Sequence, residues 1–341
     1  MAYQNVGTPR FYIDIPTYLN SIGEDYGDGF DKSLFTLNPI TPVVFLEGQE
    51  GGSANIELSY SLDQLCNPHK FYFAILNHNI NYSDNINNDG TLAADTISFK
   101  ISNLKDDSNT PTGVLNYDST FSEGSTIFTG DISGNNTNTS LAFADINLVE
   151  DVYSGSVSFG SYYDMKNSAD LDLTMEVEFD GYNSFQTAGG STLTNVTYNG
   201  SPYWNDKDGN KVEPFSVGTS TGVSKRNGRR NWSRKFSYVS DKDLFASNYM
   251  SNTHLETTTD YDTDDLTTDT NEFEYTLNND DSFIAQVLNK VGNGQRFIFQ
   301  PDNTNNNPDQ FAICVLDQDS LSIKQVAYKV YDISLKIREV W

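Results

Sequence analysis

The sequence contains few of the residues on which metal binding and disulfide cross-linking depend. It has two cysteines, Cys66 and Cys314, and three histidines, His69, His78 and His254. Two cysteines so far apart cannot staple a chain of 341 residues, and the apolar segments around them predict buried free thiols. No His-x-x-x-His pair is present, and two cysteines and three histidines spread along the chain do not form the spaced pairs of a zinc motif, so the sequence does not support a zinc site.

The signatures of common enzyme classes are also missing. There is no Gly-x-Ser-x-Gly, no phosphate-binding P-loop and no dinucleotide-binding fingerprint. Carboxylates are so abundant that some pair would lie at the separation used by glycosidases by chance alone. We therefore expect no enzyme, no catalytic residue and no cofactor. The acidic segments 25–31 and 205–209 lack the spacing of an EF-hand, so we interpret them as ordinary turns, with weak structural calcium as the alternative.

Long apolar runs and positive charge are scarce as well. No apolar run reaches the roughly 18 residues that would predict a membrane span, and residues 1–9 do not resemble a signal peptide. We expect synthesis in the cytoplasm of a host and no membrane insertion. The chain has 21 basic and 47 acidic residues, a formal net charge of −26. Such a surface repels nucleic acid at long range, so no direct nucleic-acid role is expected.

Aromatic residues, by contrast, are common: they make up 13% of the chain, which argues against disorder. Residues 71–76 are continuously apolar and predict a strand buried on both faces, with His78 as a hydrogen-bonded polar end. Residues 11–15, followed by Pro16, predict a short edge strand or arm. Further strands are predicted near residues 56–62, 97–101, 157–159, 175–179, 232–238, 297–299, 311–316 and 331–337.

Short strands joined by polar turns predict a mainly β chain of two domains. In the region between the domains, Asp208-Gly209 predicts a hairpin whose strands hold Trp204 and Val212. We expect a β-sandwich or jelly roll over residues 1–190, a linker and hairpin region over residues 191–224, and a second β domain with one or two short helices over residues 225–341.

Two helices are predicted in the C-terminal domain. One begins at Ser240 or Asp241 and extends to about Tyr249. The other begins at Asp281 or Ser282 and ends at Gly292, with its apolar face turned to the strands. The predicted core residues are Trp232, Phe283, Val287, Phe297, Phe299 and Leu335.

One cluster of charge stands out. Residues 225–235 hold six of the 21 basic residues, and the acidic segment 256–274 follows. The basic cluster could be a solvated turn at Asn227-Gly228, a nucleic-acid patch, or a subunit contact in which it meets the acidic segment of the next copy in a ring. The candidate subunit-contact residues are Arg226, Arg229, Arg230, Arg234, Asp260, Asp262, Asp264 and Asp265.

The C-terminal segment resembles the ending of phage minor-tail and distal-tail proteins. The resemblance lies in Arg-Arg-Asn-Trp-Ser at 229–233, Phe-Ile-Phe-Gln-Pro at 297–301, Phe-Ala-Ile-Cys at 311–314 and Arg-Glu-Val-Trp at 338–341, with Phe236 and Phe283 between. It implies a split β-barrel that forms rings at the tail tip. The acidic segment departs from the compact form of that family. Residues 1–12 are similar to structural proteins of marine phages, and residues 73–79 to galactose-binding-like β-sandwiches of phage tails.

These features lead to one expected function with two alternatives. We expect a structural protein of a phage virion, located in the tail tip or baseplate, whose partners are copies of itself in a ring and other tail proteins. The first alternative is a receptor-binding module for host glycans, served by exposed aromatic and amide side chains in residues 198–204. The second is a capsid decoration protein.

Overall fold

A computed structural model describes about three fifths of the chain, in segments that include most of the C-terminal third. The described residues are 6–23, 32–46, 53–58, 70–79, 97–102, 115–122, 124–132, 140–147, 151–179, 181–196, 200–205, 211–215, 228–245 and 280–341.

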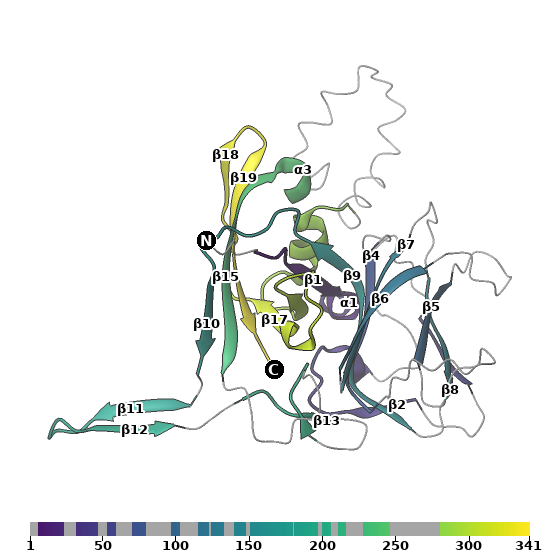
Figure 1. Ribbon diagram of the computed structural model, residues 1–341, viewed down its shortest axis with the longest axis horizontal. Coiled ribbons are helices and arrows are strands. Elements are labelled where there is room, and N and C mark those ends of the chain that lie inside the picture. Colours follow the sequence, from purple (N-terminus) through teal and green to yellow (C-terminus); the bar gives the residue numbers. More distant parts are fainter. Residues whose placement is uncertain are drawn as a thin grey trace.

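The structure is mainly β with a few short helices, which confirms the predicted fold class (Figure 1). A 12-stranded antiparallel sheet has the order β10-β15-β19-β17-β16-β1-β9-β4-β7-β6, with β18 paired to β19 and β2 paired to β9. Its strands are β1 (Arg10–Asp14), β2 (Val43–Leu46), β4 (Lys70–His78), β6 (Leu115–Ser122), β7 (Ser125–Ile132), β9 (Val152–Asp164), β10 (Thr174–Glu178), β15 (Arg229–Ser240), β16 (Phe297–Gln300), β17 (Ala312–Leu316), β18 (Ile323–Ala327) and β19 (Val330–Glu339).

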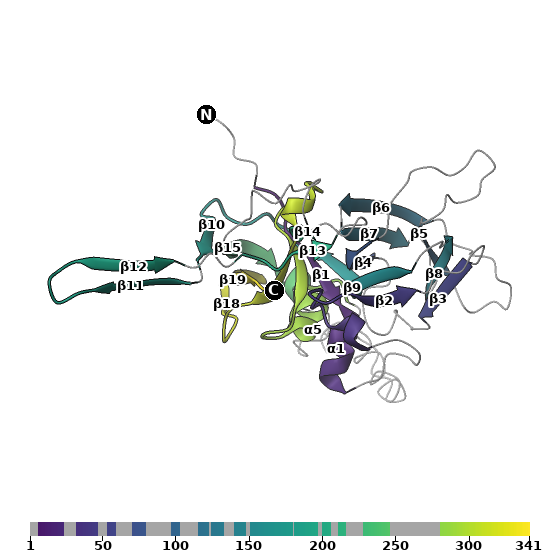
Figure 2. The ribbon, with the colours of Figure 1, turned by 90° about the horizontal axis from the view of Figure 1, so that it is seen from below.

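Three smaller sheets and several short helices complete the described structure. The three-stranded sheet β3-β8-β5 lies beside β6 and β7, on the side away from β15 (Figures 1 and 2). The smaller strands are β3 (Ser53–Leu58), β5 (Ile97–Ser102), β8 (Ser140–Asn147), β11 (Tyr182–Gln186), β12 (Thr192–Val196), β13 (Trp204–Asn205) and β14 (Lys211–Val212). The helices are α1 (Ile15–Ile22), η1 (Lys32–Phe35), α3 (Asp241–Leu244), η3 (Ile284–Leu288), α5 (Asn289–Val291) and η4 (Pro308–Gln310).

Strand β1 lies in the middle of the large sheet, so the prediction of an edge strand or arm is wrong. It pairs with β9 on one side and with β16 on the other. Pro16 does not interfere because the strand ends at Asp14 and Pro16 stands in the first turn of α1, where its missing N–H is not needed. An ion pair of 2.6 Å between Arg10 and Asp164 joins the start of β1 to the end of β9.

The large sheet buries apolar residues on both of its faces near β1. Phe11 and Ile13 belong to the larger hydrophobic cluster, whereas Tyr12 between them belongs to a second cluster. The neighbouring strand β16 repeats this, since Phe297 and Phe299 enter the first cluster and the residue between them the second. All six predicted core residues are buried in the larger cluster: Trp232, Phe283, Val287, Phe297, Phe299 and Leu335.

The helix predicted from Asp281 or Ser282 to Gly292 is present, but part of it is wound more loosely than an α-helix. Residues 284–288 form the π-helix η3, and α5 continues it to Val291. Phe283 stands at its start, with its ring 5.8 Å from the ring of Phe11. The other predicted helix is a single turn, α3, and Tyr249 lies outside the described residues. The helix α1 was not predicted.

The structure also tests the predictions for β4, its polar end, the cysteines and the strand near residue 56. Strand β4 is buried from Phe71 to His78, as predicted for a strand covered on both faces. The ring Nε2 of His78 lies 2.9 Å from the hydroxyl of Thr126, so this histidine is a hydrogen-bonded strand end. Cys314 is buried, as predicted, and Cys66 lies outside the described residues. The strand predicted near residues 56–62 begins earlier, as β3.

The large sheet runs across the predicted domain boundary. Strand β10, assigned to the first domain, pairs with β15 of the second, and β1 joins β9 to β16. None of the helices in the described part of the chain is long and apolar enough to cross a membrane.

The first testable prediction concerns the core. Phe283→Ala should lower the free energy of unfolding by about 3–5 kcal/mol, because it leaves a cavity between the helix and β1. Phe283→Leu retains most of the volume and should cost clearly less. Urea unfolding of both variants measures the difference. Equal and small losses would contradict the packing of this helix.

The second prediction concerns Asp14, which is buried at the start of α1 and accepts hydrogen bonds from the backbone N–H and hydroxyl of Thr17 and from the hydroxyl of Ser158. Burial raises the pKa of Asp14 from 3.8 to about 6, against the opposing effect of these hydrogen bonds. The folded state therefore holds this proton more tightly, and the resulting stability is lost as pH rises from about 4 to 6.

Asn at position 14 caps a helix as well as Asp does but does not titrate. The stability of the wild-type chain relative to Asp14→Asn should therefore fall by roughly 2–3 kcal/mol between about pH 4 and pH 7. Urea melts of both proteins across this range measure the difference. Parallel stability curves would show that the carboxyl group titrates normally.

Candidate functional site

The described part of the predicted basic cluster lies along β15, where Arg230 makes its contacts within the chain. Two contacts join its guanidinium group to the carboxylate of Glu339, from Nη2 to Oε1 (2.9 Å) and from Nε to Oε2 (3.1 Å). Two more run to the carbonyl groups of Asp309 and Phe311. The side chains of Arg230 and Glu339 are only 13% and 5% exposed. Four of the five guanidinium N–H groups of Arg230 are therefore engaged within the chain, which leaves little of this side chain for the predicted contact with a neighbouring subunit.

Arg229 and Arg234, the other two described arginines of the cluster, also have contacts within the chain. Arg229 lies over the ring of Trp341, at 4.6 Å from its centroid. Arg234 lies over Phe299 at 5.9 Å, on the core side of the sheet, which does not suit a subunit contact. Arg226 and the predicted acidic partners Asp260, Asp262, Asp264 and Asp265 lie outside the described residues.

Metal binding finds no support in the described part of the chain, where no three His, Cys, Asp or Glu side chains gather closely enough to hold an ion. Residues 25–31 and residues 206–209, which hold the two acidic turns considered for calcium, lie outside the described residues.

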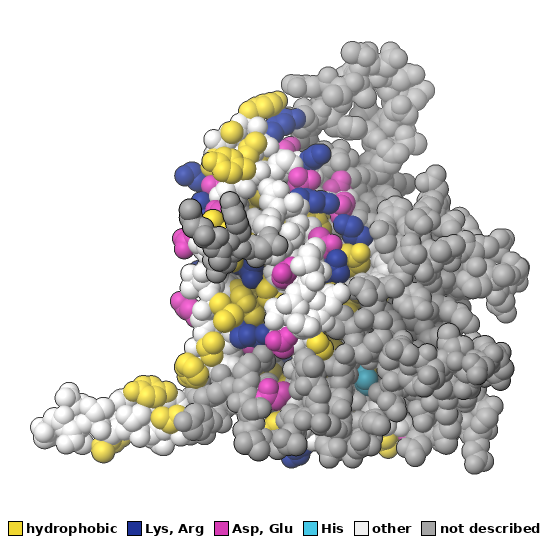
Figure 3. Space-filling view, in the orientation of Figure 1, with side chains coloured by type: hydrophobic (Ala, Val, Ile, Leu, Met, Phe, Trp, Pro, Cys, Tyr) yellow, Lys and Arg dark blue, Asp and Glu magenta, His cyan; other side chains and the backbone are white. Residues whose placement is uncertain are grey.

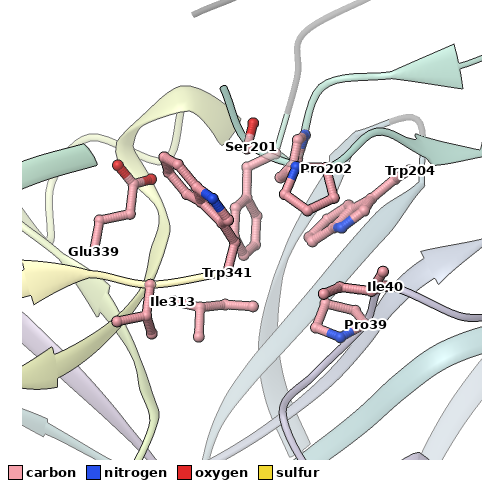
Figure 4. A pocket seen from close by; sticks show the side chains of 11 residues that line it. Pro39, Ile40, Ser201, Pro202, Trp204, Ile313, Glu339 and Trp341 are labelled. Carbon is pink, nitrogen blue, oxygen red and sulfur yellow. The ribbon is translucent and has the colours of Figure 1, made fainter. Parts of the chain in front are cut away.

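An apolar pocket lies where the C-terminus meets β13 and residues 39–40 (Figure 4). Trp204 and Trp341 lie on different sides of it, and Glu339 on its wall is already paired with Arg230. The pocket has an empty volume of about 360 Å³, which includes space open to solvent. The pocket lining is mostly apolar, and its one carboxylate, that of Glu339, is paired with Arg230. The walls therefore suit a flat apolar group.

The hairpin predicted around Asp208-Gly209 is confirmed, since Trp204 of β13 pairs with Val212 of β14. Trp204 is buried, with its ring 4.9 Å from that of Phe215. The expectation that this residue is exposed to host glycans is therefore wrong. The indole packs into the second hydrophobic cluster because its own hairpin folds it against the sheet.

The edge of the large sheet at β10 carries an apolar stripe that sequence reasoning did not single out as a site. Every second residue from 171 to 179 is apolar, and these side chains are between 38% and 76% exposed. Met175 pairs with Trp232, and directly paired residues point to the same side of a sheet. The side of β10 that carries Met175 is therefore the same side of the sheet as the buried Trp232, but the apolar side chains of β10 on that side are exposed. We call Leu171, Leu173, Met175, Val177 and Phe179 the apolar stripe; Met175 and Val177 belong to β10, and the other three flank it in the sequence.

A hairpin arm, β11–β12, leaves the sheet directly after β10 and projects away from the body (Figures 1 and 2). Both strands are exposed at every residue. Tyr182 pairs with Val196, and Phe185 with Leu193. Residues 182 and 185 are an odd number apart, so the two pairs lie on opposite faces of the hairpin. Each face of the arm therefore carries one apolar pair that is open to solvent.

Comparison of the chain with protein-family models, with curated proteins and with solved structures gave no match.

The third prediction tests the internal role of Arg230. Arg230→Ala removes the guanidinium group from the buried carboxylate of Glu339 and should cost roughly 3–5 kcal/mol of stability. The matched control is Arg338→Ala on the adjacent strand, whose pair with Glu178 has side chains 32% and 40% exposed. That loss should be about 0–1 kcal/mol. Thermal or urea unfolding measures the stability that each variant loses. If both variants lose equally little stability, Arg230 is not a fold-stabilising residue.

Proposed function

We propose that this chain is a non-catalytic structural protein of a phage virion, a part of the tail tip or baseplate that assembles with copies of itself into a ring. The observation that carries the proposal is the projecting arm with the apolar stripe at its base. A lone two-stranded hairpin is at best marginally stable in water. Exposed apolar residues on both faces of the arm are typical of a surface that a neighbouring molecule covers in an assembly.

The assignment to a phage tail rests on the resemblance of the C-terminal segment to distal-tail and minor-tail proteins. Two features of the fold support it. The sheet from β15 to β1 packs around the buried helix η3, as a split β-barrel-like domain would. The second sheet, β3-β8-β5, lies beside β6 and β7, as in a β-sandwich (Figure 1). In this proposal the sandwich projects from a ring of barrel-like domains.

The pocket beside Trp341 favours a second candidate function, the recognition of a host receptor glycan by the tail. An aromatic wall can stack on the apolar face of a sugar ring. A glycan array with the purified chain tests this candidate, and substitution of Trp341 by Ala should abolish any binding it detects.

The fourth prediction concerns location and assembly. The purified chain should sediment as an oligomer, and electron micrographs should show closed rings. Antibody labelling of particles that contain the chain should mark the tail tip. A chain that stays monomeric at high concentration would contradict the proposed assembly, and label on the head would identify a capsid decoration protein instead.

The absence of catalysis is tested separately. The purified chain should not hydrolyse host polysaccharides or peptidoglycan. Turnover that a single Asp or Glu substitution abolishes would overturn the assignment as a structural protein.

A further inference from the structure

We infer that the arm β11–β12 of one copy packs on the apolar stripe at β10 of a neighbouring copy. This inference rests on the proposed self-assembly and specifies the two surfaces that meet. Both surfaces belong to the same chain and are joined at residues 179–182, so every copy offers one donor and one acceptor.

The stripe has the properties of an acceptor surface. Strand β10 is the last strand at its end of the sheet, so the backbone groups on its outer side face no further strand in the described structure. Its side chains alternate, with Met175 and Val177 on the core-facing side and Glu176 and Glu178 on the other. An incoming apolar segment is therefore accepted on the core-facing side, because carboxylates occupy the opposite one. Backbone pairing along such an open edge is a common mode of recognition.

The arm has the properties of a donor. Its two strands are already paired, and docking on a neighbour stabilises a hairpin that is marginal on its own. Phe185 and Leu193 form the apolar pair farther from the body, where they can reach another molecule. In the space-filling view the arm shows only apolar and uncharged polar side chains (Figure 3).

The distribution of charge along the chain indicates that the molecule bound at the stripe is a second copy of this chain. One residue in five is charged overall, and the net charge is −26, so two copies repel each other. Residues 181–205, which include the whole arm, contain no Asp, Glu, Lys, Arg or His. An uncharged arm held away from the body lets two acidic molecules join with little electrostatic cost, because repulsion between their bodies falls with distance and salt.

This mode of contact predicts a salt dependence of definite sign. Added salt screens the repulsion between acidic bodies and leaves apolar contacts intact, so association should strengthen from low to physiological ionic strength. A contact between the basic cluster and the acidic segment of a neighbour would weaken over the same range. The sign therefore separates the two modes of assembly.

The experiment compares the full chain with variants of the arm, the stripe and an unrelated exposed tyrosine. Deletion of residues 182–196 removes the arm at its base, where Tyr182 and Val196 are paired. Phe185→Ser with Leu193→Ser removes the outer apolar pair of the arm, and Met175→Ser with Phe179→Ser removes two of the five side chains of the stripe. The control is Tyr328→Ser, because Tyr328 is 85% exposed at the tip between β18 and β19.

Sedimentation velocity over a concentration series gives the association constant of each protein. We expect the deletion to be monomeric and each double variant to associate at least about a hundredfold more weakly, since two large apolar side chains leave the interface. The control should match the wild-type chain. All variants should unfold at the wild-type urea concentration, because the altered residues are exposed.

The outcomes distinguish the inference from the proposed function. If the wild-type chain is monomeric, both fail. If it forms oligomers that survive the deletion or either double variant, or that weaken with salt, the arm contact is wrong while self-assembly stands. Disulfide trapping gives a direct test of proximity: Phe185→Cys mixed with Met175→Cys should yield a cross-linked heterodimer, and Tyr328→Cys mixed with Met175→Cys should not.

Discussion

The structure depends on the burial of β1 on both of its faces. Phe11 and Ile13 enter one hydrophobic cluster and Tyr12 the other, while the backbone of the strand pairs with β9 and β16. A strand in this position must be apolar on both sides and must lack a proline within its ladder. Because the two pairings join residues more than 130 positions apart, the first and last parts of the chain share one sheet.

Coverage of the sheet decreases from this strand outward to β10. Near β1 the apolar residues of both faces are buried by helices, hairpins or other strands. At β10 the apolar side chains on the core-facing side are not covered, and the apolar stripe is exposed to solvent. A sheet that ends in an open apolar edge is prone to association, which natural proteins either block or use. Here the uncharged arm starts at that same edge, so the chain supplies a complementary apolar surface where one is needed.

Charged residues have two separate roles, one within the chain and one between copies in the proposed assembly. The arginines of β15 are engaged within the chain: Arg230 neutralises the buried carboxylate of Glu339, and Arg229 lies over Trp341, the last residue. They help to hold the C-terminal strand against its neighbours. In the proposed assembly the excess of acidic residues keeps the bodies of separate copies apart, and association uses the arm, which carries no charge.

Local patterns in the sequence determined the mainly β class, the double burial of β4, the helix at Phe283 and the core around it, and the hairpin of Trp204 and Val212. Each of these follows from periodicity or turn chemistry within a few residues. Only the tertiary structure decided that β1 is central and that Arg230 faces Glu339, because these depend on partners far away in sequence. The arm escaped prediction for a different reason: its apolar residues lie one pair on each face, so the alternation that marks a half-buried strand is absent.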